Sequence, residues 1–579
     1  MKTLIFTTVM MLAVYSAEAQ LCFDVKQIGG TGNDRCSSSA IDAAGNLYIS
    51  GVFSGTVDFD PGPGVDTRIS NGNFDAYLCK FSTLGNLVWA RTWGGSNMDR
   101  ADGLALNKFN QIYVCGPYQS TVDFDPGIGT DIHTSNAGSM NNPYISMFDT
   151  AGNFIWVRTW GTINGGSEAY SCATDKFGNV YAVGDFHDQP GVAIDFDPGI
   201  NVDNHFINGI DSSLNFDAWL VKYDSMGNYQ WGKNWGGDLY DDGPTVAVDD
   251  GGVYDAGMFM SQNADFDPDS VATDIHSSHG YIDVFINKFD LNGNHIWTRT
   301  WGGTGADDAG HILADNAGHI YIAGYFADTV DFDPGAGVFN LIGNTGIDDI
   351  FISKLDTSGN FIWAESMGGT GEDKAFPLTS DVNGDLYFSG IFSDTADFDP
   401  DSGVYNLYSA GGYDIYICKL DTDGDMIWAK SMGGSGDDRG STISVANNGD
   451  IYLGGDFSAT ADLDPENSTY YLSSAGGTDI YINKIYDCST VNINELDASE
   501  SLSVQPNPAN DNVNIKITSS SSTNNSVVNI YNMQGLLILH SEINNAMQKQ
   551  INIQDIPSGV YIVKVIVENS IATAKLIKN

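Results

Sequence analysis

The chain has 579 residues, of which 42% are hydrophobic, enough for a packed core and against disorder as its general state. Nine of its 74 acidic residues are Glu and the rest are Asp, a residue that favours turns. The net charge of −49 argues against nucleic acid and anionic membranes as partners and favours cations or cationic surfaces, although a solubilising coat has the same composition.

The N-terminus has the features of a signal peptide spanning residues 1–19. Lys2 supplies the charged start, residues 4–15 form an apolar run too short to span a bilayer, and residues 17–19 form an Ala-x-Ala cleavage site. We therefore expect cleavage between Ala19 and Gln20. No later stretch is apolar and long enough to cross a membrane, so we predict an exported protein without a transmembrane segment, in a compartment where disulfides form.

A four-residue motif, Asp-x-Asp-Pro, recurs through most of the chain and sets its period. The seven copies begin at residues 58, 123, 195, 265, 331, 397 and 462, so they are 65 to 72 residues apart. The second residue is Phe in every copy except the last, which has Leu463. A fixed period of this kind indicates a repeat architecture.

Each repeat is predicted to hold four short strands. In the copy at 307–367, these are residues 311–314, 320–326, 349–355 and 361–367, separated by turns rich in Asp, Asn and Gly. Four short strands per repeat are typical of a β-propeller blade. No stretch shows a sustained helical period.

The first and last repeats are incomplete in complementary ways. Residues 22–28 supply only a fourth strand, and the last copy stops after its third strand, at residues 479–486. We therefore predict an all-β fold, in which residues 20–488 form a seven-bladed β-propeller with four-stranded blades. The N-terminal strand is expected to close the ring, because closure removes exposed sheet edges.

Two cysteines lie near the predicted seam. Aligned on the Gly-Gly pairs of the repeats, Cys22 takes the position of Leu87 and Cys488 that of Leu84, three residues apart across a β-turn. That separation suits a disulfide, so we predict a Cys22–Cys488 clasp, with two free thiols as the alternative. Five cysteines remain, an odd number, and their spacing is not that of a zinc site.

The fourth strands carry tryptophans four residues apart, such as Trp89/Trp93 and Trp297/Trp301. This even spacing puts both rings on one face of a sheet. We predict that they pack between adjacent blades, because later copies replace the second ring by Met367 and Met432. The alternative is a platform on which sugars stack.

The composition changes after residue 488, where Ser and Asn replace Asp and Gly. We predict a linker at 489–500 and a small antiparallel β-sandwich at 501–579, because the segment has alternating runs. The sandwich resembles the type A sorting domain of the bacterial type IX secretion system, on the residues Pro506-Asn507-Pro508, 530–535, 557–561 and Lys575-Leu576-Ile577-Lys578. The alternative is an ordinary terminal β-domain.

The resemblance to a sorting domain has consequences for location. It implies that the type IX secretion machinery recognises the C-terminal domain and passes the protein through the outer membrane of a Gram-negative bacterium. It also implies removal of the domain, followed by release or attachment to surface polysaccharide. The expected location is therefore secreted or on the outer-membrane surface.

The repeats resemble the bacterial β-propeller repeat family over residues 21–486. The shared segments are residues 45–51, 414–420 and 433–438, whereas the Asp-x-Asp-Pro insert is less typical of that family. The resemblance implies a fold and little about activity.

The paired carboxylates of the motif are candidate calcium ligands. In an extended segment both Asp side chains point the same way, and two hard oxygens on a loop stiffened by Pro suit Ca²⁺. The alternative is that the Asp side chains cap loop amides while the Phe plugs the blade, which sevenfold repetition favours. The candidate ligands are Asp58, Asp60, Asp123, Asp125, Asp195, Asp197, Asp265, Asp267, Asp331, Asp333, Asp397, Asp399, Asp462 and Asp464.

A second set of acids lies in the loop before each first strand. Because strands alternate in direction, this loop and the motif loop are expected on the same face, which would then carry a ring of carboxylates. The residues are Asp34, Asp99, Asp242, Asp308, Asp373 and Asp438.

The sequence lacks the common enzyme signatures, including G-x-S-x-G, H-E-x-x-H and the P-loop, and its nine His are scattered. We therefore predict a non-enzymatic binding or adhesion module for a glycan or a protein, with calcium as a candidate cofactor. The alternatives are a polysaccharide-active enzyme on the same scaffold and a structural surface protein without a discrete ligand. A specific site is sought first in blade three, where residues 161–168 and 188–191 depart from the repeat.

Overall fold

The computed structural model describes residues 21–487 and 501–578, apart from gaps at 136–139, 163, 190, 209–214, 270–271, 316, 345, 467–468, 519–525, 532–536, 544–547, 555, 558 and 568–569. The predicted signal peptide, with its Ala19–Gln20 cleavage site, and the predicted linker at 489–500 lie outside the described residues. The regular elements are all strands, which confirms the all-β prediction. Among the described residues, no helix has the length and apolarity to span a membrane. The chain divides into two compact units, one spanning Leu21–Tyr486 and one containing the C-terminal domain.

The larger unit is built from antiparallel groups of four strands, here called sheets I to VII in chain order. Sheets I to IV are separate, whereas sheet V is continuous with a hairpin and sheets VI and VII are joined in one larger sheet. Sheet I has β2 (Arg35–Ile41), β3 (Leu47–Phe53), β6 (Asp75–Phe81) and β7 (Leu87–Trp93). Sheet II has β8 (Gly103–Leu106), β9 (Ile112–Tyr118), β12 (Asn142–Phe148) and β13 (Phe154–Thr159). Sheet III has β14 (Gly166–Thr174), β15 (Val180–His187), β18 (Asp217–Tyr223) and β19 (Tyr229–Trp235).

The remaining sheets repeat this order. Sheet IV has β20 (Asp241–Val248), β21 (Val253–Phe259), β24 (Asp283–Phe289) and β25 (His295–Trp301). Sheet V has β26 (Asp308–Ala314), β27 (His319–Phe326), β30 (Asp349–Asp356) and β31 (Phe361–Gly369). Sheet VI has β32 (Lys374–Ser380), β33 (Leu386–Phe392), β36 (Asp414–Leu420) and β37 (Met426–Gly434). Sheet VII has β38 (Arg439–Val445), β39 (Ile451–Asp462), β40 (Tyr471–Asp487) and, from the other end of the chain, β1 (Leu21–Gly30).

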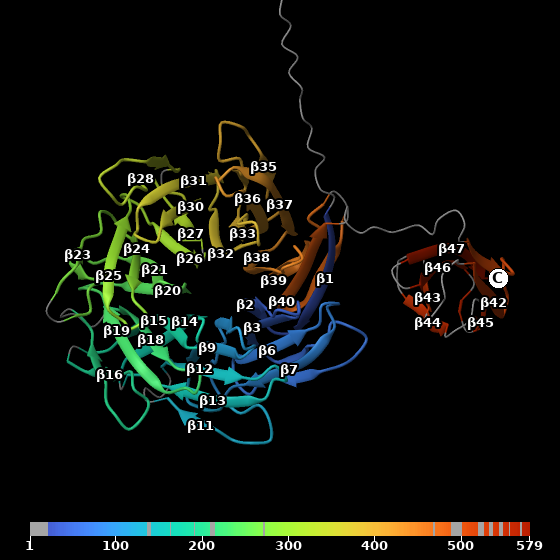
Figure 1. Cartoon of the computed structure of the whole chain (residues 1–579), viewed down its shortest axis with the longest axis horizontal. Helices are drawn as coiled ribbons and strands as arrows, with labels where there is room; N and C mark the ends of the chain where they lie inside the picture. Colours follow the sequence, from blue (N-terminus) through green and yellow to red (C-terminus); the bar gives the residue numbers. More distant parts are fainter. Residues whose placement is uncertain are drawn as a thin grey trace, which may run out of the picture. The chain divides into compact units, whose positions relative to one another are not determined.

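The first strand of each sheet contacts the first strand of the next, and β38 in turn contacts β2. Figure 1 shows the sheets of this unit following one another around a common centre, with the last repeat beside the first. The outermost strand of sheet VII is β1, which is hydrogen-bonded to β40. The N-terminal segment therefore completes the sheet that the last repeat leaves with three strands.

A short hairpin carries each acidic motif and ties neighbouring sheets together. The hairpins are β4 (Thr56–Asp58) with β5 (Thr67–Ile69), β10 (Thr121–Asp123) with β11 (Ile132–Thr134), β16 (Ala193–Asp195) with β17 (Asn204–Phe206), β22 (Ala264–Asp265) with β23 (Ile275–His276), β28 (Thr329–Asp331) with β29 (Asn340–Ile342), and β34 (Thr395–Asp397) with β35 (Asn406–Tyr408). The seventh copy lies within β39 and β40. Gly433 at the end of sheet VI pairs with Asp462, and Gly29 at the end of β1 pairs with Asp58 in the same way. The seam between the chain ends thus repeats the junction found inside the chain.

The apolar residue of each motif is fully buried between two sheets. Phe59 packs with Ile28 and Ile480 of sheet VII and with Phe53 and Tyr77 of sheet I. Its counterparts in the other copies also have no exposed surface: Phe124, Phe196, Phe266, Phe332, Phe398 and Leu463. The observed packing therefore agrees with the interpretation in which the apolar residue of the motif is a plug between sheets.

The tryptophans also join neighbouring sheets. Trp89 is 8% exposed, and its Nε1 donates to the carbonyl of Thr150 in the next sheet over 3.2 Å. Trp156 and Trp231 make the equivalent contacts to Ser225 and Leu291. These contacts support packing rather than an open platform for sugars.

The C-terminal unit contains two antiparallel sheets, β41 (Ser501–Gln505), β42 (Asn512–Thr518) and β45 (Gln548–Asn552) in one, and β43 (Ser526–Tyr531), β44 (Leu537–Ile543), β46 (Gly559–Val567) and β47 (Ser570–Lys578) in the other. Buried side chains of both sheets, such as Val513 and Ile515 from one and Val528 and Val563 from the other, form one core. This is the architecture of a small β-sandwich.

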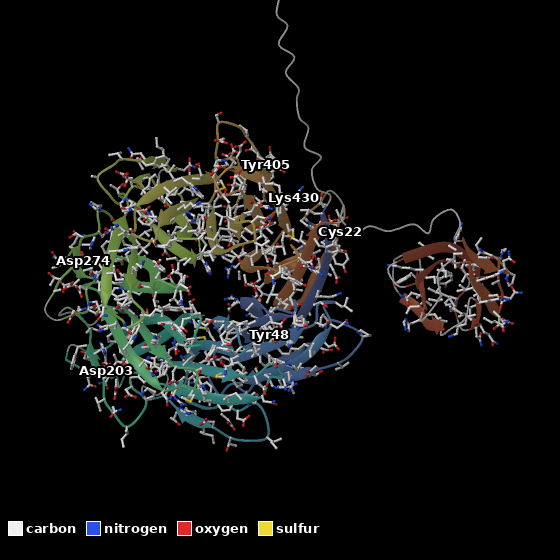
Figure 2. All side chains as sticks on the ribbon, viewed as in Figure 1. Cys22, Tyr48, Asp203, Asp274, Tyr405 and Lys430 are labelled. Atoms are coloured by element: carbon white, nitrogen blue, oxygen red, sulfur yellow. The ribbon has the colours of Figure 1, made fainter. Side chains whose placement is uncertain are left out.

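Cys22 on β1 is disulfide-bonded, and Figure 2 marks its position. Its predicted partner, Cys488, lies outside the described residues, so the pairing stays a prediction. The other five cysteines are buried and free in the part of the chain that the structure describes: Cys36, Cys79, Cys115, Cys172 and Cys418. Their burial suits small apolar side chains rather than reactive thiols.

The plug position gives a stability prediction. Phe332→Ala should lower the free energy of unfolding by about 3–5 kcal/mol, because it leaves a cavity between two sheets. Phe332→Leu should cost less than about 1.5 kcal/mol, because Leu463 fills the same position naturally. Urea denaturation measures both, and Phe177→Ala, at a side chain 61% exposed, is the control. Equal losses in the Ala and Leu variants would contradict the plug.

The predicted clasp can be tested chemically. A non-reduced digest should contain a peptide pair linking Cys22 to Cys488, found by mass spectrometry. Cys22→Ser should then lower stability by on the order of 4 kcal/mol in the chain-entropy model, because the closed loop is very long. A Cys22 linked to any other cysteine, or to a second chain, would contradict the clasp.

Candidate functional site

The Asp-x-Asp-Pro loop uses its carboxylates on its own backbone. Oδ1 of Asp58 accepts hydrogen bonds from the amides of Asp60 (3.1 Å) and Asp66 (2.8 Å), and Oδ1 of Asp60 accepts one from Gly62 (2.8 Å). The first of these bonds, from the amide two residues on to the motif's first Asp, recurs in all seven copies. The carboxylates therefore act as loop caps, as Asp does in tight turns.

This geometry does not fit the predicted calcium site. Ca²⁺ takes six to eight oxygen ligands. In the loop of Asp58 and Asp60, the three amide hydrogen bonds described above already occupy one oxygen of each Asp. The second carboxylate also folds back over its loop, where only a Gly fits, as at Gly64 and Gly129. Among the described residues, no group of three or more His, Cys, Asp or Glu is placed to hold a metal ion. The calcium prediction thus has no support from these loops.

The loop before each first strand holds a buried Asp that bridges two sheets. Oδ2 of Asp34 accepts the amide of Gly30 from β1 (2.8 Å), and Oδ1 accepts that of Ser54 from its own sheet (3.0 Å). Asp99 makes the same two bonds to Gly95 and Gln119. The other members are Asp241, Asp307, Asp373 and Asp438, and all six are fully buried.

Two predicted members of this set are wrong by one residue. Asp241 and Asp307 occupy the bridging position, whereas the predicted Asp242 and Asp308 follow them on the first strand. The pairs Asp241-Asp242 and Asp307-Asp308 look alike in sequence, so only the hydrogen bonds separate them. In sheet III the equivalent residue is Ser167. Its backbone amide donates to the carbonyl of Asn141, as the backbone amide of each bridging Asp donates to the equivalent carbonyl in the other sheets.

A second buried acid begins the third strand of most sheets and faces the first acid. The set is Asp75, Asp217, Asp283, Asp349, Asp414 and Asp479, with Asn142 in sheet II. The first Gly of each Gly-Gly pair leaves room for this side chain: a Cβ on Gly94 would lie 2.5 Å from Cγ of Asp75. The Gly-Gly pairs are therefore a packing requirement of the buried acid.

Burial shifts the pKa of the bridging Asp residues upward. It raises the pKa of Asp34, Asp99, Asp241 and Asp438 to about 6, and that of Asp307 to about 7. For Asp373 burial raises the pKa to about 8, with a further contribution from the charge of Asp349. These groups bind protons in the folded protein at a pH where a free Asp is ionised.

The shifts predict how stability depends on pH. An unfolded Asp titrates near 3.9, so between about pH 4 and pH 8 the folded state binds more protons than the unfolded state. Stability is then greatest on the acidic side of this window and is lost as pH rises through the folded pKa values of about 6 to 8. The melting temperature, measured at constant ionic strength, should fall from pH 5 to pH 8. A rise over that range would contradict the assignment.

One variant isolates a single carboxylate of this set. Oδ2 of Asp414 accepts the amide of Ala410 (2.6 Å), whereas Oδ1 is buried without a partner, and burial raises its pKa to about 6. Asp414→Asn keeps the acceptor, as Asn142 does in sheet II, so it should stabilise the protein by about 1–2 kcal/mol at pH 8 and reduce the pH dependence. The exposed Asp423→Asn should change stability by less than about 0.5 kcal/mol. A loss of stability in Asp414→Asn at both ends of the pH range would contradict this role.

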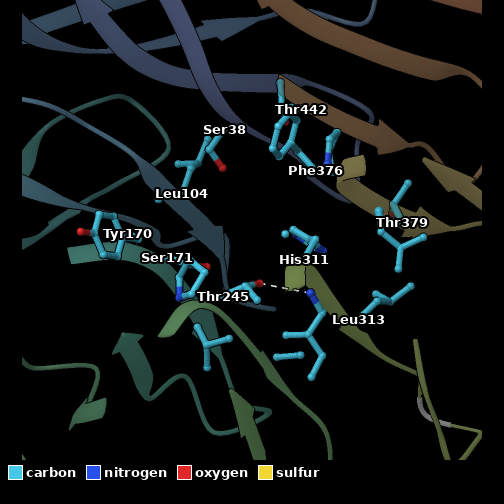
Figure 3. Close-up of a pocket in the computed structure, with 18 of the residues that line it drawn as sticks. Ser38, Leu104, Tyr170, Ser171, Thr245, His311, Leu313, Phe376, Thr379 and Thr442 are labelled. Carbon is cyan, nitrogen blue, oxygen red and sulfur yellow. Dashed lines mark hydrogen bonds between the residues drawn. The ribbon is translucent and has the colours of Figure 1, made fainter. Parts of the chain in front are cut away.

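The first strands line a pocket of about 450 Å³ at the centre of the larger unit. Figure 3 shows its side chains coming from strands on several sides, with the Thr245 hydroxyl accepting a hydrogen bond from the amide of Ile312 (3.2 Å). The walls are mainly polar or small. His311 is the pocket's histidine, and burial lowers its pKa to about 4, so its ring is neutral.

The strand framework around the pocket repeats, but the residues that line it do not. Every first strand except the short β8 has a register shift near its start, after the fourth residue in β14 and after the second residue in the others, which exposes at least one extra residue to the pocket. β-bulges of this kind re-aim side chains and often lie next to functional sites. The residues at this position are Ser37, Asp102, Tyr170, Pro244, Gly310, Phe376 and Ser441.

Seven charged residues, here called the rim, each lie two positions before the pocket-lining residue named above. One contact shows that these residues are equivalent. The carbonyl oxygen of each lies against the central Gly of the second strand, in the space that a Cβ would need. The carbonyl of Arg35 lies against Gly51 in this way, and that of Asp308 against Gly324. The rim residues are Arg35, Arg100, Glu168, Asp242, Asp308, Lys374 and Arg439. The acids belong to the adjacent sheets III to V, and the bases to sheets VI, VII, I and II. The repeat therefore carries a rim with two oppositely charged halves.

In the acidic half of the rim, Asp242 and Asp308 each accept a Tyr hydroxyl at one oxygen and have no hydrogen-bond partner at the other. Burial raises the pKa of Asp242 well above its usual range, with further contributions from Asp185 and Asp308. Burial also raises the pKa of Asp185 to about 7, helped by Glu168, and that of Asp308 to about 6. One oxygen of Asp242 and one of Asp308 are buried without a hydrogen bond.

The bases at the two ends of this acidic half are already paired. Arg100 contacts Asp102 (2.8 Å) and Glu168, and Glu168 also accepts a hydrogen bond from Asn141. Lys374 contacts Asp348 (2.8 Å). The positive charges next to the acidic half are therefore engaged with other carboxylates.

Sequence reasoning did not find the rim. Its members differ in charge from sheet to sheet, so no repeated signal marks them, and in a chain with 74 acids a single Asp is not distinctive. The one useful signal was the departure of blade three from the repeat, because Glu168 lies in the segment singled out there. The hydrogen-bonded register was needed to place the other six residues beside it.

The model of the secretion system C-terminal sorting domain matches residues 503–579. The chain carries this sorting domain. It is therefore a secreted or outer-membrane surface protein of a Gram-negative bacterium, and the sorting domain engages the type IX secretion machinery. This confirms the predictions of the C-terminal domain and of the location.

Two curated proteins are similar to the repeat region. A WD repeat-containing protein of Acanthamoeba polyphaga mimivirus is 21% identical over 421 residues, which cover 63% of this chain and 30% of that protein. The regulatory protein FlaEY of Caulobacter vibrioides is 25% identical over 180 residues, covering 30% of this chain and 18% of that protein. The chain spans less than a third of the length of these relatives. The WD repeats support a β-propeller repeat protein.

Solved structures also resemble the chain, among them the following two. Sqt1 from Chaetomium thermophilum is 10% identical, covers 75% of this chain and 97% of its own, and has a TM-score of 0.32. The extracellular domain of a putative hybrid two component system from B. thetaiotaomicron is 10% identical, covers 96% of this chain and all of its own, and has a TM-score of 0.17. Similarity at this level carries no information about a ligand.

Proposed function

We propose that the protein is a secreted or surface-attached, non-enzymatic binding module whose larger unit is a closed seven-bladed β-propeller. The contact between β38 and β2 supports closure, as does the pairing of Gly29 with Asp58, which repeats that of Gly433 with Asp462. The ligand, a glycan or a protein, binds at the central pocket and its rim. Central pockets lined by several sheets are common positions for ligands on propellers.

The binding proposal rests on one observation. The strands around the pocket repeat from sheet to sheet, but the side chains that they present to the pocket differ. The bridging Asp, the Gly-Gly pair and the plug recur around the larger unit because the fold needs them at most junctions; the junction with Gly161-Thr162 and Ser167 keeps only the plug. The fold has no such need for six residue types at the seven positions after the rim. A surface component without a discrete ligand would be expected to repeat its lining as it repeats its loops.

A polysaccharide-active enzyme is the second candidate, and Glu168 beside Asp185 is the observation that favours it. Burial and the charge of Glu168 raise the pKa of Asp185 to about 7, as in acid–base catalysts. However, Asp185 is 2% exposed, and Glu168 is engaged by Arg100 and Asn141. The first carboxylate is buried and the second is already engaged, so binding is the better proposal.

The test uses the full-length secreted chain on glycan and protein arrays. Ser441→Tyr fills part of the pocket at a position where sheets III and VI already have Tyr170 and Phe376, so the fold should accept it. We expect ligands of the wild type to bind this variant at least about tenfold more weakly, because a filled pocket loses shape complementarity. Ser358→Tyr, on an exposed turn, should bind like the wild type.

Two results would contradict the binding proposal. The first is a set of arrays without any specific ligand, which would favour a structural surface component. The second is equal binding by the Ser441→Tyr and Ser358→Tyr variants. Release of sugars from a bound glycan, abolished in Glu168→Gln, would replace binding by the enzyme proposal.

A further inference from the structure

We propose that the central pocket binds the terminal sugar of an uncharged glycan, with the sugar hydroxyls against one wall of the pocket and the C–H groups of the ring against the other. This inference rests on the proposed function and adds the chemical class of the ligand. Three features of the lining support it: its lack of free charge, the separation of its hydroxyl and apolar side chains, and the hydroxyls that the described part of the protein leaves unpaired.

The lining of the pocket has no free charge. Among the described residues that line it, Asp102 is the only Asp, Glu, Lys or Arg, and its carboxylate contacts the Arg100 guanidinium at 2.8 Å. His311 also lines the pocket, but burial lowers the pKa of its ring to about 4, so the ring is neutral. A charged group of a ligand would lose water here without gaining a counter-charge, which is costly. The lining therefore favours an uncharged ligand, although the net charge of the chain is −49.

Hydroxyl and apolar side chains lie on different sides of the pocket. The half-buried lining residues from the first strands of sheets VII and I are all serines: Ser37, Ser38, Ser39, Ser441 and Ser444. Those from the first strands of sheets IV and V are apolar apart from His311: Pro244, Val248, Gly310, Leu313 and Ala314. Figure 3 shows Ser38 across the pocket from Leu313. The pocket therefore has a hydroxyl wall and an apolar wall.

Several hydroxyls of the lining are available to a ligand. Four of them are half-buried rather than buried and make no hydrogen bond to any side chain or backbone group that the structure describes: those of Ser38, Ser171, Thr379 and Ser441. Ser39 differs, because its hydroxyl bonds those of Thr442 (2.6 Å) and Ser444 (2.8 Å) and so holds the wall in place. A hydroxyl both donates and accepts, so each free one can pair with a sugar hydroxyl in either direction.

The inner edges of the first strands add further uncharged groups. Each first strand pairs with the second strand of its own sheet and, among the described residues, with no strand along its other edge. Consecutive residues of these strands line the pocket, such as 244–248 and 310–314. An unpaired strand edge presents backbone N–H and C=O groups. These groups supply donors and acceptors for sugar hydroxyls without adding charge.

A sugar ring has the same division of groups as the pocket. Its hydroxyls lie around the edge of the ring, whereas its C–H groups form apolar faces that gain from leaving water. Phe376, half-buried on the first strand of sheet VI, adds an aromatic ring on which such a face can pack. The volume of about 450 Å³ also lies within the range of about 300–1,000 Å³ that is usual for sites of small ligands. A terminal sugar therefore matches the pocket in charge, in polarity and in size.

The experiment measures binding of soluble glucans, mannans, xylans and galactans to the full-length chain by calorimetry, with polygalacturonate and chitosan as charged counterparts. A neutral polysaccharide should bind, and its affinity should change less than about twofold between about 50 mM and about 500 mM NaCl, because no ion pair is screened. Thr379→Val and Ser38→Ala should each weaken binding by about three- to tenfold, because each removes one hydrogen-bonding hydroxyl and little volume. Thr422→Val makes the same change on an exposed turn and should bind like the wild type.

Three results would overturn this inference. The first is tighter binding of polygalacturonate or chitosan than of every neutral polysaccharide, or an affinity that falls steeply with salt, since either would mean a charged ligand. The second is binding by Thr379→Val and Ser38→Ala that equals that of Thr422→Val, which would mean that the hydroxyl wall does not contact the sugar. The third is a panel in which no polysaccharide binds. If Ser441→Tyr then still abolishes binding of a protein from the array, the ligand class is wrong and the proposed function stands.

Discussion

Each junction between neighbouring sheets is held by backbone amides that donate to a buried side chain, in most cases a carboxylate. The bridging Asp lies between the last strand of one sheet and the second strand of the next, and it satisfies amides from both. A buried amide without an acceptor is costly, so this bond fixes how the sheets meet. At most junctions a second acid adds like charge, and burial raises the pKa of the bridging Asp. The fold thus accepts an electrostatic cost to satisfy its backbone.

The junction explains why the motifs recur as they do. Each Gly-Gly pair makes room for the second acid and for the backbone of the hairpin that follows. Each motif loop caps its own amides and inserts one apolar side chain between two sheets. Because these requirements are the same at every junction, they recur with the same spacing. The seam between the chain ends meets them too, with Gly29, Asp34, Asp58 and Asp479 in the places that other junctions fill from one continuous segment.

The features that recur are the ones that the sequence predicts. The spacing of the motifs predicts the period, and the alternation of apolar and polar residues predicts the four strands per repeat and the missing strand of the last repeat. The role of the Asp-x-Asp-Pro carboxylates was not, because paired oxygens suit both a metal ion and a capped turn. The sequence also predicts Asp242 and Asp308 at the bridging position, which Asp241 and Asp307 occupy. A shift of one residue moves a side chain from the junction to the rim. The contacts between successive first strands support the proposed count of seven blades and the proposed closure of the ring.

The rim could not be predicted for the opposite reason. Its seven positions are equivalent in the backbone but carry Arg, Lys, Glu or Asp according to the sheet, so no spacing marks them. A repeat architecture makes such differences informative once the register is known. Arg100 and Glu168 occupy one structural position in adjacent sheets, and the fold treats them alike. Their difference in charge therefore reflects something other than folding.

The net charge of the chain and the charge of the rim act over different distances. At physiological ionic strength the Debye length is about 8 Å, so most of the −49 charge is screened from a partner approaching in solution. Exposed acids then increase the rate of encounter with any cationic surface but do little to select one. Asp185 and Asp242 are buried, where screening is weak and an unpaired charge is costly. The groups at the contact itself, rather than the net charge, therefore decide which partner is selected.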